Sequence, residues 1–144
     1  MLKLPPKMEE VLLLIHGRGL KEVDAARELG VSKQAVSKAV REGRGRLTQL
    51  FLSLAETLNA DIVRVSLDRG YAVLKLRQLG ARAYAFYVPG KGIRVLFGGE
   101  VDCRGENSRL CSEVVEAARR WGLLKRVEGD LGKAVRDLLK AVEG

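Results

Sequence analysis

Residues 20–46 read LKEVDAARELGVSKQAVSKAVREGRGR, a pattern that predicts two short helices separated by a tight turn. The first helix is expected over residues 21–29, where Val23, Ala26 and Leu29 recur at helical spacing. Residues three apart lie on one side of a helix, so these three would form a single apolar face. The stretch therefore predicts a helix-turn-helix, the element around which the rest of the chain is arranged.

Gly30 and Ser32 define the predicted turn. Glycine can take a positive φ and so end the first helix, and the Ser32 hydroxyl can cap the second by accepting from a free N–H of its first turn. The second helix is expected from residue 33 to about residue 41. Its buried stripe is predicted to be Ala35, Val36 and Ala39. Small or branched residues suit the place where two helices cross nearly at a right angle, and Ala26, Gly30 and Val36 supply them.

This combination of apolar spacing, turn glycine, N-cap and polar helix start resembles the helix-turn-helix of bacterial and archaeal transcription regulators. The matching residues are Ala26, Leu29, Gly30, Val31, Val36 and Ala39. The segment VSKQAVSKAVREGRGR is most similar to plasmid regulators of the TrfB/KorA type and archaeal regulators of the Tfx type. The resemblance covers the N-terminal part of the chain and implies double-stranded DNA as the partner.

In such regulators, exposed residues early in the second helix meet base edges in the major groove. The corresponding positions here hold Ser32, Lys33, Gln34, Ser37 and Lys38. Glutamine can form two hydrogen bonds with adenine, and lysine can donate to guanine. The arginines that follow, Arg41, Arg44 and Arg46, suit phosphate contacts, which position a protein without reading sequence. The competing interpretation is that all these residues form the solvated faces of a helical hairpin.

Composition is consistent with a polyanionic partner. The chain has 144 residues, 26 basic and 18 acidic, with a net charge of +8, and its basic excess lies before residue 101. The start of the chain does not read as a signal peptide and no run has the length of a membrane span, so a soluble, cytoplasmic protein is expected. Few Asn and Gln residues among many Arg and Glu residues hint at a thermophile or a GC-rich genome.

Beyond the helix-turn-helix, the sequence predicts an α+β fold. A supporting helix is expected from Pro6 to Gly17, and an amphipathic helix over residues 47–60. Four short alternating segments follow between residues 61 and 99 and predict an antiparallel β-meander. A helix over residues 107–122 would cover the sheet, with Trp121 as a core anchor, and a final helix is expected over residues 131–142.

Two domains are expected. Residues 1–60 would form the helix-turn-helix domain with a linker or dimer helix, and residues 61–144 an α+β domain for dimerisation or sensing of an unidentified small-molecule effector. A homodimer is predicted because one recognition helix reads few base pairs. The helix over 47–60 could pack on the helix-turn-helix or on the sheet, form a dimer seam, or do both. The apolar stripe of the last helix makes residues 61–144 the expected main determinant of dimerisation.

Catalytic chemistry, cofactors and metals are not expected. The sequence shows no phosphate-binding loop, no nucleophile motif and no convincing acidic cluster. His16 is the single histidine and is read as a helix-end residue. Cys103 and Cys111 lie eight residues apart without a CxxC pair, so two free buried thiols are favoured over a disulfide.

Three other functions remain open from the sequence. The protein could be an architectural or plasmid-partition DNA-binding protein, or a protein-interaction module whose helix-turn-helix contacts the transcription machinery. The predicted sheet could also bind single-stranded nucleic acid by stacking, although burial of its aromatic rings is the favoured interpretation. Its basic and aromatic residues are Arg64, Lys75, Arg77, Arg82, Arg94, Tyr71, Tyr84, Phe86 and Tyr87.

Overall fold

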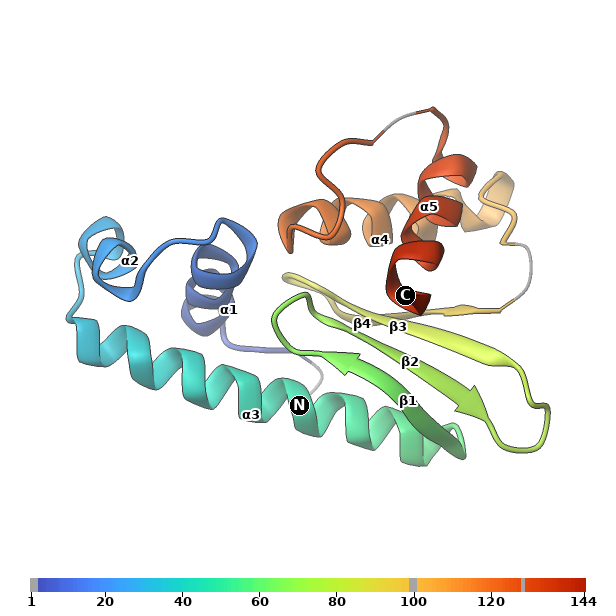
Figure 1. Ribbon diagram of the computed structural model, residues 1–144, viewed down its shortest axis with the longest axis horizontal. Coiled ribbons are helices and arrows are strands. Elements are labelled where there is room, and N and C mark those ends of the chain that lie inside the picture. Colours follow the sequence, from blue (N-terminus) through green and yellow to red (C-terminus); the bar gives the residue numbers. More distant parts are fainter. Residues whose placement is uncertain (1–2, 99–100, 128) are drawn as a thin grey trace.

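The computed structural model describes residues 3–98, 101–127 and 129–144 and confirms the α+β class (Figure 1). The N-terminal helices are α1 (Pro6–Leu12), the π-helix η1 (Leu13–Gly17), α2 (Glu22–Leu29) and α3 (Lys33–Thr57). The strands are β1 (Ala60–Ser66), β2 (Tyr71–Leu76), β3 (Arg82–Val88) and β4 (Gly92–Phe97). The chain ends with η2 (Gly105–Asn107), α4 (Ser108–Arg120) and α5 (Leu131–Glu143). No helix in the described ranges is long and apolar enough to cross a bilayer.

The helix α3 is one continuous element of 25 residues, so the predicted break between residues 41 and 47 is wrong. Its buried residues form a single stripe that passes through Gly43, and they are Val36, Gly43, Leu47, Phe51 and Ala55. Glycine lowers helix propensity by roughly 1 kcal/mol, but packing of a continuous apolar stripe outweighs that cost. At 1.5 Å per residue the helix is about 38 Å long. It joins the helix-turn-helix directly to the sheet (Figure 1).

The sheet has the predicted meander order β1-β2-β3-β4, with each neighbouring pair antiparallel. Both of its faces are covered by helices: α3 lies on one side, with α1 packed on α3 near the end of the sheet, and α4 and α5 lie on the other (Figure 1). The residues toward α1 and α3 include Ala72, Leu74, Ala83, Ala85 and Tyr87. Those toward α4 and α5 include Tyr71, Val73, Tyr84 and Phe86. Because these aromatic rings are buried in the two cores, they do not form a stacking surface for single-stranded nucleic acid.

The edge strand β1 departs from simple alternation. Its register with β2 shifts between Ile62 and Arg64, which marks a bulge at Val63. Val63 and Val65 alternate with Arg64 and Ser66 in the sequence, and both valines are 48% exposed. The sheet therefore presents two apolar side chains at one of its edges.

The C-terminal helices contribute to both cores, since Trp121 at the end of α4 packs in the core that α3 covers, and α5 packs in the other. Trp121 is 1% exposed, and its indole N–H donates to the carbonyl of Tyr87 at 2.9 Å, which confirms its expected role as a core anchor. The helix α5 begins as predicted, with the Asp130 carboxylate accepting from the Lys133 N–H at 2.8 Å. Its apolar stripe packs within the same chain, through Val135, Leu138 and Val142. This stripe is therefore not available to a second copy, and the argument that it forms a dimer seam is wrong.

The favoured expectation of two free thiols is also wrong, because Cys103 and Cys111 form a disulfide. Their Cα atoms lie 5.7 Å apart, within the range that a disulfide needs. Both residues are buried in the core beneath α5. The disulfide ties the segment before η2 to the first turn of α4.

Candidate nucleic-acid interface

The turn between α2 and α3 has the predicted geometry. Gly30 adopts a left-handed conformation with φ of 67°, and the Val31 N–H donates to the carbonyl of Ala26 at 3.0 Å. The Ser32 hydroxyl accepts from the Ala35 N–H at 3.0 Å and caps α3. These contacts satisfy backbone groups at the end of one helix and the start of the next, so the two helices are held at a fixed angle.

A small core holds α2 against α1 and α3. It consists of Val11, Leu14, Ala25, Ala26 and Val36, with Leu29 and Ala39 packed against it. Two sequence expectations need correction, since Val23 is 48% exposed and Ala35 is also exposed. The true buried face of α2 is centred on Ala25 and Ala26, because α2 turns these small residues toward α1 and α3.

The predicted base-reading residues all lie in the first turns of α3 or at its cap. Lys33, Gln34 and Lys38 are exposed. The other two serve the fold as well, because Ser32 caps the helix and the half-buried Ser37 donates to the carboxylate of Glu22 on α2. The long polar side chains are therefore the ones left to reach a partner, and the serines fix the helix that presents them.

Helical spacing places several residues of α3 on one exposed face. Gln34, Lys38, Arg41 and Gly45 are separated by steps of four, three and four, which places them on one face. Val36, Gly43 and Leu47 form the opposite, buried face. We call the first set the outer face of α3. It combines an amide, two cations and a glycine, which suits contact with a polyanion.

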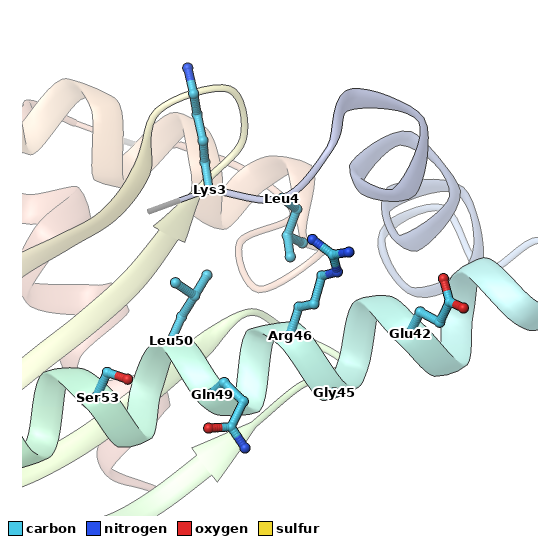
Figure 2. Close-up of a pocket in the computed structure, with 8 residues that line it drawn as sticks. All are labelled: Lys3, Leu4, Glu42, Gly45, Arg46, Gln49, Leu50 and Ser53. Atoms are coloured by element: carbon cyan, nitrogen blue, oxygen red, sulfur yellow. The ribbon is translucent and has the colours of Figure 1, made fainter. Parts of the chain in front are cut away.

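The three predicted phosphate-contacting arginines do not share this face. Only Arg41 belongs to it by helical spacing. Arg44 lies on one flank and forms an ion pair with Asp68, in the turn between β1 and β2. Arg46 lies on the other flank and lines a hollow of about 570 Å³ between α3 and the N-terminal segment (Figure 2). The three arginines therefore surround the helix instead of forming one row.

The turn between β1 and β2 connects the N-terminal helices to the rest of the chain, a role that the sequence did not reveal. The guanidinium of Arg69 donates to the carbonyl of His16 at 2.8 Å and to that of Trp121 at 2.9 Å. Asp68 lies 3.6 Å from the His16 imidazole as well as pairing with Arg44. This turn thus bridges the end of η1, the middle of α3 and the end of α4.

The pKa of His16 is lowered in this setting. Burial is the largest cause, the positive charges of Arg44 and Arg69 act in the same direction, and the nearby Asp68 carboxylate opposes them. His16 therefore favours its neutral form, which fits a helix-end residue packed beneath the turn. No group of three or more metal-ligating side chains occurs within residues 3–98, 101–127 and 129–144.

Comparison with known proteins agrees with this geometry. No curated protein and no solved structure matches the chain. A family model does match residues 1–47, and its description is sigma-70, region 4. These residues include α1, α2 and the first part of α3, which form the helix-turn-helix in the structure. The N-terminal part of the chain is thus similar to sigma-70 region 4, a helix-turn-helix DNA-binding fold, and this similarity supports DNA binding and a function connected with transcription.

Proposed function

We propose that the protein is a sequence-specific transcription regulator that binds duplex DNA as a homodimer. The observation that carries this proposal is the outer face of α3, where Gln34, Lys38 and Arg41 are exposed on the second helix of a helix-turn-helix. A helix of this kind fits the major groove, where base edges are distinguishable. We also propose that this regulator is of the archaeal or plasmid type, which the segment over residues 31–46 resembles.

The proposed roles follow from position on α3. Lys33, Gln34 and Lys38 read base edges, and Ser32 and Ser37 lie beside them at the groove. Arg41 contacts phosphate from the outer face. Arg44 and Arg46 contact the DNA backbone from the two flanks of α3. The ion pair with Asp68 fixes the Arg44 side chain in this position. Each role has a chemical counterpart, since amides and amines recognise bases and guanidinium groups recognise phosphates.

In this proposal, residues 1–60 bind DNA and residues 61–144 form the dimer. Both segments contribute to one core, in which Leu47 and Phe51 of α3 pack with Ala72 and Leu74 of β2. Because α3 is continuous, the position of the sheet fixes the orientation of the recognition residues. A dimer formed through the sheet would therefore set the distance between two recognition helices.

We place the dimer contact at β1. This strand is at the edge of the sheet and presents Val63 and Val65, and the pairing of such an edge with a second copy is a common way to protect it. Light scattering of the full-length protein should show a dimer, and Val65→Lys should shift it toward the monomer. A wild-type protein that remains monomeric at tens of micromolar would remove the dimer from the proposal.

Selection of binding sites from random duplex DNA tests the proposed function most broadly. A regulator should enrich one motif, and a dimer should enrich a motif with two-fold symmetry. An architectural DNA-binding protein would bind without enriching a motif. A protein-interaction module would show little salt-dependent binding to any duplex.

A further inference from the structure

Two glycines occupy the interior of α3, at positions 43 and 45. Glycine in a helix interior is unfavourable because the flexible backbone loses more conformational freedom than that of alanine. A glycine at such a position therefore calls for a physical reason. The structure supplies that reason for one of the two glycines within this chain.

Gly43 is required by packing against α1. A Cβ atom added there would lie 2.8 Å from Cδ1 of Leu12 and 3.0 Å from Cγ of Met8. Both of these side chains are buried in the main core. Close approach of α1 and α3 thus explains the absence of a side chain at Gly43.

Gly45 has no such neighbour. Apart from its chain neighbours and the surrounding backbone of α3, a Cβ atom added there would meet no described atom within 4 Å, and its φ is not in the left-handed region. The residue is exposed, on the outer face of α3 and at the rim of the hollow that Arg46 and Gln49 also line (Figure 2). Within the described part of the chain, nothing requires glycine at this position.

The surroundings of Gly45 favour an anionic neighbour. Arg41 lies one turn before it on the same face, and Lys38 lies one turn further back. The adjacent Arg46 adds a third cation, while Glu42 is 3.9 Å from Lys38 and partly offsets its charge. A second copy of α3 placed here would bring these cations against one another, whereas a phosphate backbone would be attracted to them.

The position along the helix agrees with this occupant. Gly45 is eleven residues beyond Gln34, or about 16 Å along the helix axis. The major groove is about 12 Å wide, so a helix whose first turns meet base edges reaches a flanking phosphate backbone at about this distance. A residue without a side chain allows that backbone to approach the helix closely.

We propose that Gly45 is the point at which the sugar–phosphate backbone of duplex DNA crosses α3, next to Arg41 and Arg46. This proposal rests on the proposed function and adds a steric requirement to it. A methyl group at residue 45 would hold the phosphates away from the cations on either side. Gly45→Ala should therefore raise stability, because alanine is the better helix former, and lower DNA affinity. A purely structural glycine would not give these two opposite effects.

The experiment measures urea unfolding, dimerisation and duplex binding for the full-length wild type and three variants. Gly45→Ala should unfold at a higher urea concentration and bind a random duplex at least fivefold more weakly. Ser112→Ala is the matched control, since it improves helix propensity at an exposed position of α4, away from the hollow, and should leave DNA affinity unchanged. Gly43→Ala should unfold at a lower urea concentration than Gly45→Ala because of its contact with Leu12.

Each contrary result has its own meaning. Gly45→Ala with wild-type affinity, or with lowered stability, overturns the proposed crossing point. Weaker DNA binding that accompanies a loss of dimer overturns it too, and assigns Gly45 to an interface between two copies. A wild-type protein that binds no duplex at low salt overturns the proposed function itself, which is a result distinct from an unchanged variant.

Discussion

Arg44 of α3 and Asp68 of the turn between β1 and β2 form an ion pair across 24 residues of sequence. The pair joins α3, which carries the proposed recognition residues, to the sheet. It also means that one of the arginines predicted to bind phosphate is already partnered within the chain. The arginines of α3 should therefore differ in how much each contributes to the salt dependence of DNA binding.

Replacement of Arg41 by alanine should flatten the salt dependence of duplex binding by about one unit of log K against log salt, because one phosphate contact is lost. Arg44→Ala should flatten it less, since Arg44 shares its charge with Asp68. Asp68→Asn is the matched variant and should increase the contribution of Arg44. Anisotropy titrations at several salt concentrations measure all three slopes. Equal slopes for Arg41→Ala and Arg44→Ala would refute this ranking.

Gln34→Ala and Lys33→Ala should relax sequence preference more than they weaken binding to random DNA. Each should cost about 1–3 kcal/mol at the selected site if it contacts a base edge. Binding to the selected site and to a scrambled duplex gives the comparison. If the variants lose affinity equally for both duplexes, these residues contact DNA without reading its sequence.

Stability should fall as pH drops below the ordinary pKa of histidine, about 6.5. The pKa of His16 is lowered in the folded protein, chiefly by burial and also by Arg44 and Arg69 against the opposing Asp68. The unfolded chain therefore binds the proton first, so this contribution is present above pH 6.5 and is lost as pH falls through the folded pKa. Urea midpoints between pH 7.5 and 5 should decline more steeply for the wild type than for His16→Gln. Parallel declines would show that His16 is not the titrating group.

Reduction of the disulfide between Cys103 and Cys111 should destabilise the protein by about 2–3 kcal/mol, the loop-closure value for a short cross-link. Urea unfolding with and without a reductant measures this difference. The double variant Cys103→Ser/Cys111→Ser is the control, and its stability should not respond to the reductant. Thiol titration of the unreduced, denatured protein should detect no free thiol, and two free thiols would contradict the disulfide.

Local features of the fold could be predicted from the sequence because their causes are local. Gly30 ends α2 in the left-handed conformation and Ser32 caps α3, and both assignments depend on neighbours within four residues. The four strands could also be predicted, because the alternation of apolar and polar residues and the turn glycines are patterns of neighbouring residues.

Features that depend on distant partners could not be predicted. The continuity of α3 through Gly43 depends on the packing of Leu12, which lies on another helix. The pairing of Arg44 with Asp68 depends on where the turn between β1 and β2 meets α3. Burial of both faces of the sheet also depends on tertiary arrangement. In the sequence, alternation of apolar and polar residues along a strand predicts one buried face and one exposed face.

The most direct test of the central claim compares two charge-matched double variants for binding to one duplex at about 100 mM salt. Lys38→Ala/Arg41→Ala removes two cations from the outer face of α3, and Arg119→Ala/Arg120→Ala removes two exposed cations from the end of α4. Net charge is the same in both, so any difference reports position. If α3 binds DNA, the α3 variant loses affinity by about tenfold or more while the α4 variant stays close to the wild type. Equal losses would mean that the protein attracts DNA only through its overall charge, and would contradict the assignment of α3 as the helix that binds DNA.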